Sequence, residues 1–205
     1  MKKEHRYIIF LLLLIIAVVF IYQRIMRKKF VVAKAKNELE TWRGLTEKDK
    51  ETHSMLVEYW QQGAGFNWIT SENIDHYSTA YAWSAAFICF IMRLEYSYFP
   101  QTSTHAAYTV AARERRKAGH SSFIAYEPNE YKPQPGDIVI KKRGYKGDLA
   151  GLYDTATTHG DIVIENNGDY LTVIGGNVSN SVRESIVPAK NGIINHSNWI
   201  AVIKM

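Results

Sequence analysis

The chain has 205 residues, which is room for one domain of ordinary size with an appendage, but not for two large domains. With 46% hydrophobic and 22% charged residues it can fill a core, which excludes a disordered or collagen-like chain. The net charge of +5 belongs to the N-terminus: residues 1–29 hold seven bases and one acid, leaving 18 bases against 19 acids in residues 30–205. A cationic surface for nucleic acid is therefore not expected, and no nucleic-acid partner is predicted.

Residues 7–22 form an unbroken apolar run between two tyrosines. At about 1.5 Å per residue the run reaches about 24 Å, and residues 23–26 extend it toward the ~30 Å hydrocarbon core if Arg24 snorkels. A cleaved signal peptide is the alternative, but no A-x-A site follows the run. We predict a membrane anchor over residues 1–29 that contacts the lipid bilayer through residues 7–26. Basic residues flank the run on both sides, so the positive-inside rule does not choose an orientation.

Residues 30–45 are expected to form a helical linker or stalk, and residues 46–205 the folded domain. Apolar residues at helical spacing predict a helix from Thr46 that stops at Gly63, followed by a loop over residues 63–75. A second helix begins near Trp83 and is apolar around most of its circumference, which predicts a buried central helix. A third helix is expected from Ser103 to about Lys117.

After Lys132 the pattern changes to short β-branched runs bounded by Gly, Pro and Asn. The triplet at 167–169, Asn-Gly-Asp, predicts a hairpin between the middle two runs. Helices followed by an antiparallel meander indicate an α+β domain.

Ser84 lies at the start of the predicted central helix. Free backbone N–H groups and the positive end of the helix dipole stabilise a nucleophile or a developing oxyanion there. The structural alternative is a helix cap or a small helix residue. Cys89 lies about 140° around the same helix from Ser84, so we expect it to be a small buried residue rather than the nucleophile.

His159 opens a predicted strand beside a flexible loop, which suits a general base. Asn177 ends the next strand, and the hairpin would bring its amide close enough to orient the imidazole. Asp161, two residues after His159, points to the same face of a regular strand and could steer the ring or bind a substrate amine. Taken one at a time, each residue has a structural alternative: His159 as a surface histidine at the start of a strand, and Asn177 as a turn residue after two glycines. A zinc site from His105, His159 and Asp161 is a further alternative, although no H-x-x-x-H motif is present.

Four segments occur in a recognisable order: A-W-S-A-A-F-I, P-G-D-I-V, H-G-D-I-V-I and V-I-G-G-N-V-S. They resemble the NlpC and CHAP superfamily of papain-like cysteine peptidases and amidases. They are most similar to a bacterial branch known only as a domain of unknown function, whose members read W-S-A-A-F-I, H-A-x-Y, H-x-D-I-V and I-G-G-N-V. The resemblance covers Thr46 to Met205.

The resemblance implies a papain-like fold with helices packed on a small antiparallel sheet, and a peptide crosslink or amide bond of the bacterial cell wall as substrate. By position, Ser84 takes the superfamily's cysteine site, His159 its histidine and Asn177 its asparagine. The H-A-x-Y match adds His105 and Tyr108 as residues that line the cleft, with a hydrogen-bonded histidine on a helix face as the alternative for His105, and Trp83 precedes the nucleophile. No cofactor or metal is implied. Since a serine hydroxyl is not ionised as a thiol is, Ser84 would need a base to take its proton during attack.

Three functions therefore stand beside one another. The first is a peptidoglycan peptidase or amidase anchored in the inner membrane by a single transmembrane helix. A cell-wall substrate places its C-terminal domain on the outer side of that membrane. The second is a catalytically silent module that binds wall peptides, and the third an adaptor in an envelope assembly. A cleft filled by bulky side chains such as Tyr153 would favour the last two.

Overall fold

The structure is a computed structural model that describes residues 3–205. It has an α+β architecture in which helices come first and a six-stranded antiparallel sheet follows, as the sequence pattern predicts. Its helices are α1 (Lys3–Thr41), α2 (His53–Glu58), α3 (Ile74–Ala80), α4 (Ser84–Glu95) and α5 (His105–Lys117), with a 3₁₀ turn η1 (Lys50–Thr52) and a π-helix η2 (Tyr59–Ala64) on either side of α2. Its strands are β1 (Ile124–Tyr126), β2 (Ile138–Lys142), β3 (Thr158–Asn166), β4 (Tyr170–Val178), β5 (Ser181–Pro188) and β6 (Trp199–Lys204).

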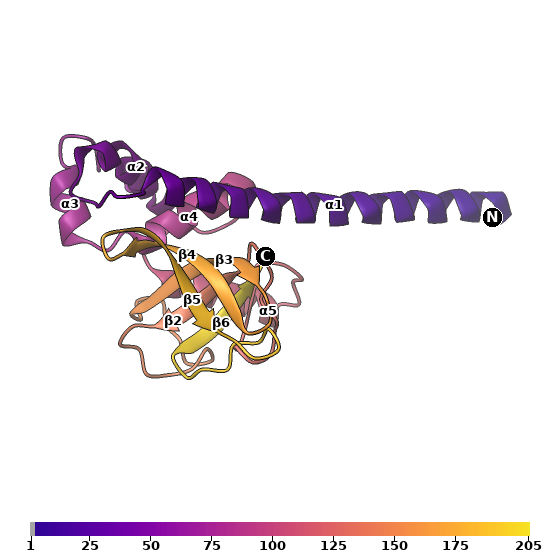
Figure 1. Ribbon diagram of the computed structural model, residues 1–205. Helices are drawn as coiled ribbons and strands as arrows, with labels where there is room; N and C mark the ends of the chain where they lie inside the picture. The colour runs from indigo at the N-terminus through magenta and orange to yellow at the C-terminus, as the bar shows by residue number, and fades with distance from the viewer. Residues whose placement is uncertain (1–2) are drawn as a thin grey trace.

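Helix α1 projects far beyond the domain at its N-terminal end (Figure 1). The helix over residues 9–41 is long and apolar enough to cross a membrane, and no part of its most apolar stretch is buried inside the protein. The exposed side chains include Phe10 and Phe20, which are 67% and 68% exposed. An exposed apolar surface of this extent is typical of a segment that contacts a membrane or another protein.

The C-terminal half of α1 packs on the domain, where Val31 and Ala35 are fully buried. The segment expected to be a stalk over residues 30–45 is helical, but one of its faces is part of the hydrophobic core. Residues 30–41 therefore position the domain directly instead of spacing it away from the apolar segment.

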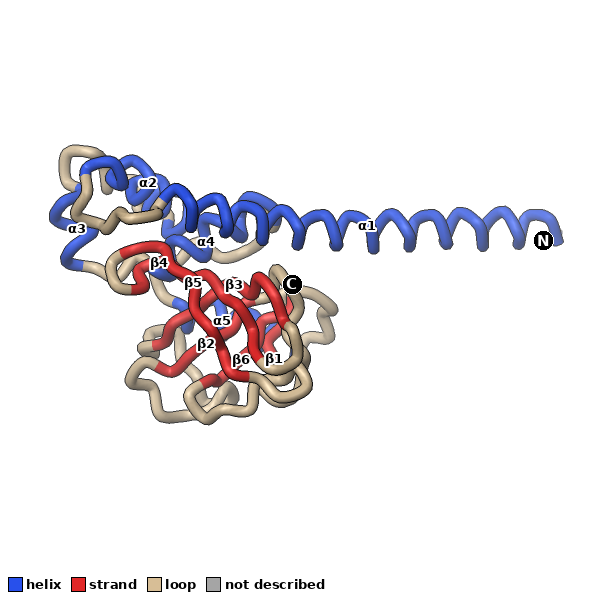
Figure 2. Tube along the Cα trace, in the orientation of Figure 1, coloured by secondary structure: helices blue, strands red, loops and turns tan. Residues whose placement is uncertain are grey.

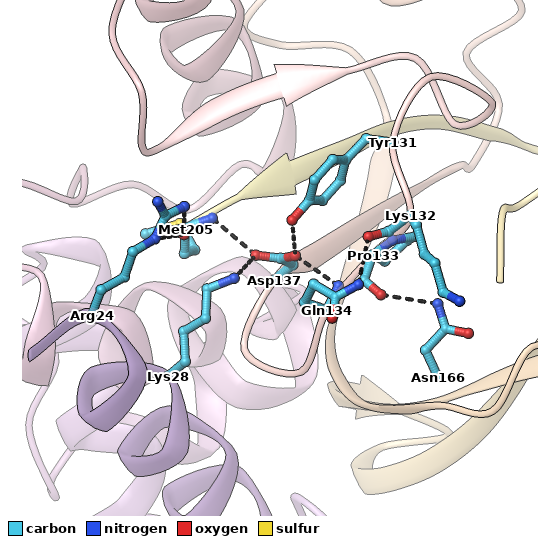
Figure 3. Close-up of polar contacts among 9 residues, drawn as sticks. All are labelled: Arg24, Lys28, Tyr131, Lys132, Pro133, Gln134, Asp137, Asn166 and Met205. Carbon is cyan, nitrogen blue, oxygen red and sulfur yellow. Dashed lines mark hydrogen bonds and ion pairs between the residues drawn. The ribbon is translucent and has the colours of Figure 1, made fainter. Parts of the chain in front are cut away.

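Asp137 fastens α1 to the sheet (Figure 3). Its fully buried carboxylate accepts a charge-assisted hydrogen bond of 2.5 Å from Lys28 Nζ. The same carboxylate accepts hydrogen bonds from the N–H groups of Met205 and Gln134 and from the Tyr131 hydroxyl. One turn earlier on α1, Arg24 donates two hydrogen bonds to the carbonyl of Met205. The C-terminal residue Met205 is thus tied to the middle of α1, at Arg24 and, through Asp137, at Lys28.

The helix expected to stop at Gly63 continues one residue further and ends at Gly65, whose φ of 81° lies in the left-handed region. Gly63 has a different role, because a Cβ there would lie 2.0 Å from the carbonyl oxygen of Ala86. Its missing side chain lets η2 pack directly against α4. The segment expected to be loop over residues 63–75 ends in α3, a short helix that the sequence pattern did not indicate.

The sheet has the strand order β1-β6-β2-β3-β4-β5, with every neighbouring pair antiparallel. The predicted turn at 167–169 joins β3 to β4, with the Asn167 N–H bonded to the carbonyl of Tyr170 and Gly168 at a φ of 104°. Figure 2 shows the helices α1 to α4 gathered on one side of the strands.

Strands β2 to β6 each divide their side chains between two apolar clusters. On β3, Ile162 faces the main core with α4, while Val163 faces a second cluster with Val139, Val173 and Val202. Strands β2, β3, β4 and β6 are therefore buried on both faces over much of their length, which explains their largely apolar sequences.

Candidate active site

Ser84 is the first residue of α4 and is 3% exposed. The N–H groups of the first turn of a helix have no partners within the helix, so this end of α4 offers donors beside the Ser84 hydroxyl. Ala85 and Ala86 follow and bring no bulk to that turn. Trp83 precedes it and is fully buried, with its indole N–H donating to Glu47 and its ring stacked on Trp42. Trp83 thus fixes the start of the helix by packing and has no surface for a substrate.

The imidazole that contacts Ser84 is that of His105. Ser84 Oγ lies 2.7 Å from His105 Nε2, and both side chains are buried. His105 is the first residue of α5, so the starts of two helices meet at this hydrogen bond. We expected His159 to be the base, with His105 lining the cleft, but the hydrogen bond in the structure gives the place beside Ser84 to His105.

Tyr108 extends this hydrogen-bond chain, because its hydroxyl lies 2.5 Å from His105 Nδ1. Two arrangements of the protons are compatible with both hydrogen bonds. If Nδ1 carries the proton and donates to Tyr108, then Nε2 accepts from the Ser84 hydroxyl, as a general base requires. In the other tautomer, Tyr108 donates to Nδ1 and Nε2 donates to Ser84. The H-A-x-Y spacing was the signal for this pair, since residues three apart share one face of a helix.

Gly160 of β3 makes room for the His105–Tyr108 pair. A Cβ at this position would lie 2.3 Å from the Tyr108 hydroxyl and 2.8 Å from His105 Nδ1. The pair therefore packs directly on the backbone of β3.

Burial sets the charge state of these groups. It lowers the pKa of His105 well below 6.5, and the nearby His159 and Arg143 lower that pKa further. Burial likewise raises the pKa of Tyr108 well above 10, helped by Cys89 and Asp161. His105 is therefore neutral at pH 7 and able to accept a proton, while Tyr108 keeps its own. Cys89 is buried as expected, and burial raises the pKa of its thiol to about 12, so it is no nucleophile.

His159 forms a second pair with Asp161 on the other face of β3. His159 Nε2 lies 3.0 Å from Asp161 Oδ1, and the two side chains are 7% and 5% exposed. The His159 and His105 rings are 5.2 Å apart between centroids, with their planes inclined at 63°. Gly175 of β4 faces this pair, since a Cβ there would lie 1.9 Å from Asp161 Oδ1. We expected Asp161 to orient the His159 ring, and the hydrogen bond between them is consistent with that role.

Asn177 lies where the pairing of β4 with β5 shifts between Gly175 and Val178, and its φ of 54° is left-handed. Among the side-chain hydrogen bonds of the described residues, none joins Asn177 to His159. The neighbour that orients His159 in the structure is Asp161.

A groove of about 450 Å³ opens next to the starts of α4 and α5, but neither Ser84 nor His105 is among its lining residues. Ala82 and Ser103, each two residues before one member of the pair, contribute to its lining. The other lining residues are almost all aromatic, and two of them, Trp68 and Tyr81, are more than half exposed. These residues are Trp60, Phe66, Trp68, Ile69, Tyr77 and Tyr81. The dense aromatic content of residues 59–81 is the sequence signal for this groove.

The loop between β2 and β3 is hydrogen-bonded to α5 and to the residue before it. Arg113 of α5 donates to the carbonyls of Leu149, Ala150 and Leu152, and Thr104 donates to that of Asp154. Tyr153 is 58% exposed, so it does not fill the cleft.

The side chains of the zinc alternative, His105, His159 and Asp161, are engaged in the hydrogen bonds described above. Within residues 3–205, no three His, Cys, Asp or Glu side chains are arranged so that they could hold a metal ion.

The fold and site together define an α+β domain with a serine–histidine–tyrosine hydrogen-bond chain at the starts of two helices. The chain belongs to a bacterial family described as an uncharacterized protein conserved in bacteria (DUF2272), whose model matches residues 55–203. Comparison with curated proteins and with solved structures gives no match.

Proposed function

We propose that this protein is a serine hydrolase that cleaves a peptide or amide bond, with Ser84 as nucleophile and His105 as general base. The observation that carries the proposal is the chain from Ser84 Oγ through His105 to the Tyr108 hydroxyl, with contacts of 2.7 and 2.5 Å. A nucleophile, a base within hydrogen-bond distance and a third group that orients the base are the three parts of such a site.

Ser84 Oγ attacks the substrate carbonyl while its proton passes to His105 Nε2. The free N–H groups at the start of α4 stabilise the negative charge on the carbonyl oxygen. His105 then gives the proton to the departing amine, which leaves an ester on Ser84. Water, deprotonated by His105, releases the acid product and restores the serine hydroxyl. Tyr108 favours the productive tautomer when it accepts from Nδ1.

The substrate we propose is a peptide or amide bond of bacterial peptidoglycan. The papain-like resemblance of the motifs around Ser84, His159 and Asn177 supports this substrate, as does an N-terminal helix that could hold the domain at a membrane. The aromatic groove, whose lining includes Ala82 two residues before Ser84, is the surface that we propose for binding a neighbouring segment of that substrate. His159 and Asp161 stay in the proposal as groups that position His105 or the substrate.

The test is an incubation of the full chain, in detergent micelles, with purified peptidoglycan, followed by mass spectrometry of the soluble products. Fragments that vanish in Ser84→Ala and persist in Ser121→Ala, an exposed serine far from the site, would support the proposal. A fluorophosphonate probe that labels Ser84 in the wild type would show an activated serine whatever the substrate. No fragments and no labelling from a folded protein would reject the hydrolase.

A binding module that does not cleave is the second candidate, favoured by the burial of Ser84 and His105 to 3% and 4% exposure. It predicts that the protein sediments with peptidoglycan while releasing no fragments, and that Trp68→Ala weakens the sedimentation more than Ser84→Ala. An adaptor in an envelope assembly would show neither property.

We further propose that α1 anchors the protein once in the inner membrane, with the domain on the outer side where peptidoglycan lies. A C-terminal alkaline phosphatase fusion should be active in cells and a C-terminal fusion to a fluorescent protein that folds only in the cytoplasm should be dark. The opposite pattern would remove the cell wall as substrate.

A further inference from the structure

A second cavity, of about 280 Å³, lies on the face of the sheet turned away from α4. His159 and Asp161 contribute to its lining, and their neighbour Gly160 instead faces Tyr108 on the helix side. The strand register sets Lys141 opposite both His159 and Trp199, so these three side chains lie in one row across β2, β3 and β6. The cavity is separate from the aromatic groove next to the starts of α4 and α5, with which it shares no lining residue.

The charge of this cavity is unbalanced. Lys141, Lys142 and Arg143 line it, whereas Asp161 is the only acidic residue of its lining. That carboxylate already accepts from His159, and none of the ion pairs among residues 3–205 includes the three cations. The domain that carries them has a slight excess of acids, so the positive charge is local to this cavity.

The size and remaining lining restrict what fits. A cavity of 280 Å³ holds a group about as large as one or two amino acids, not a polymer backbone. Ile186, which is 57% exposed, and the partly exposed Trp199 form an apolar part suited to a short alkyl side chain, whereas Val173 and Val187 are 0% and 2% exposed. A small apolar group that carries one negative charge matches both halves of the lining.

We propose that this cavity binds the carboxylate of a peptide, with Arg143 and Lys141 as its charged partners and Ile186 and Trp199 beside its alkyl side chain. The inference deepens the proposed function, since it names peptides with a free carboxylate as the ligand class. Arg143 offers paired N–H donors in the fork geometry that suits a carboxylate. His159 lies between the cavity and the Ser84–His105 pair, its ring 5.2 Å from that of His105. A ligand here is therefore electrostatically coupled to His105.

The test uses Ser84→Ala full chain in detergent micelles at low salt, so that no peptide is hydrolysed and the result does not depend on catalysis. Calorimetry compares acetyl-Ala-Ala-Ala, with its free carboxylate, with acetyl-Ala-Ala-Ala-amide. We expect the acid to bind about tenfold or more tightly than the amide, as for loss of a charged partner. Arg143→Gln and Lys141→Gln should each reduce binding of the acid by about the same factor, and Lys146→Gln, an exposed lysine outside the lining, should leave it unchanged.

A second readout follows His105 by NMR in the same protein. A bound carboxylate offsets the charge of Arg143, one of the causes that lower the pKa of His105, so the acid should raise this pKa and the amide should not. Equal binding of acid and amide, or binding that Arg143→Gln and Lys141→Gln both leave unchanged, would overturn the proposal. Inorganic phosphate that binds as tightly as the peptide acid would also overturn it, in favour of a general anion site. The binding test uses the Ser84→Ala protein and so does not depend on catalysis. If that protein binds the peptide acid while the wild type cleaves no substrate, the carboxylate site stands and the hydrolase proposal fails.

Discussion

Ser84 Oγ and His105 Nε2 lie 2.7 Å apart although 21 residues separate them in the chain. Each is the first residue of its helix, and the two helices α4 and α5 bring their N-terminal ends to the same point above β3. This geometry places a neutral imidazole beside a hydroxyl at a site of positive helix dipoles, which favours the unprotonated base. The His159–Asp161 pair lies beyond His105, with the His159 ring 5.2 Å from the His105 ring between centroids.

The choice between the two histidines is tested by replacing each with glutamine. His105→Gln should reduce kcat/KM on peptidoglycan about 100-fold or more, because general base catalysis is lost. His159→Gln should reduce it about tenfold or less, since this ring acts through His105 or the substrate. Both variants should first be shown to keep the wild-type circular dichroism spectrum. A larger loss for His159→Gln would return the role of base to the strand.

Tyr108→Phe removes the hydroxyl partner of His105 Nδ1 and keeps the ring that packs on Phe99. We expect kcat to fall about tenfold with little change in KM, because the imidazole loses the group that holds its tautomer. The measurement is a pH profile of kcat/KM for both proteins. Unchanged kcat together with an unchanged profile would show that Tyr108 only packs.

His105 also makes stability depend on pH. Its pKa in the folded protein is lowered below 6.5, so the unfolded chain binds a proton first as the pH falls. The free energy of unfolding should therefore decrease below pH 6.5, by at most about 1.4 kcal/mol per pH unit for this one group. Denaturant titrations from pH 7.5 to 5 measure it. His105→Gln should flatten the dependence, and His120→Gln, an exposed histidine, should not. Parallel curves for the wild type and His105→Gln would contradict the buried, neutral state.

Gly160→Ala tests the packing beneath the site. The added methyl would meet Tyr108 and His105 at 2.3 and 2.8 Å, so one of the two must move. We expect a loss of about 1–3 kcal/mol in the free energy of unfolding and a loss of most fluorophosphonate labelling. Gly151→Ala in the nearby loop meets no atom closer than 3.3 Å and serves as the control. Full labelling of Gly160→Ala would show that the Ser84–His105 contact does not depend on this gap.

Asp137→Ala tests the attachment of α1 to the sheet. It leaves Lys28, the buried N–H group of Met205 and the N–H group of Gln134 without their acceptor, so we expect a loss of about 3–5 kcal/mol in the free energy of unfolding. Arg43→Ala breaks an exposed ion pair with Glu40, whose side chains are 75% and 59% exposed, and should change stability by less than about 1 kcal/mol. Thermal unfolding in detergent micelles compares the two variants. Equal effects would mean that the Asp137 contacts add nothing measurable to the attachment of α1.

The local sequence determined those features that depend on neighbouring residues. The apolar run of residues 7–22 predicted the exposed half of α1, and uniform apolarity around Phe87 predicted the buried helix α4. The Asn-Gly-Asp triplet predicted the turn between β3 and β4, since few residues other than glycine adopt a positive φ readily. Cys89 was placed in the core by helical periodicity alone.

Tertiary structure decided the partner of Ser84 and the place of α1. A pattern of residues shows that His105 begins a helix and His159 a strand, but not which ring lies nearer to Ser84. That depends on how α5 packs over β3, where Gly160 leaves space for His105 and Tyr108. Likewise, the sequence shows Lys28 only as one of the basic residues that follow the apolar run. The tertiary structure pairs it with the buried carboxylate of Asp137. Such contacts join segments far apart in the chain, and their geometry follows from packing rather than from local propensity.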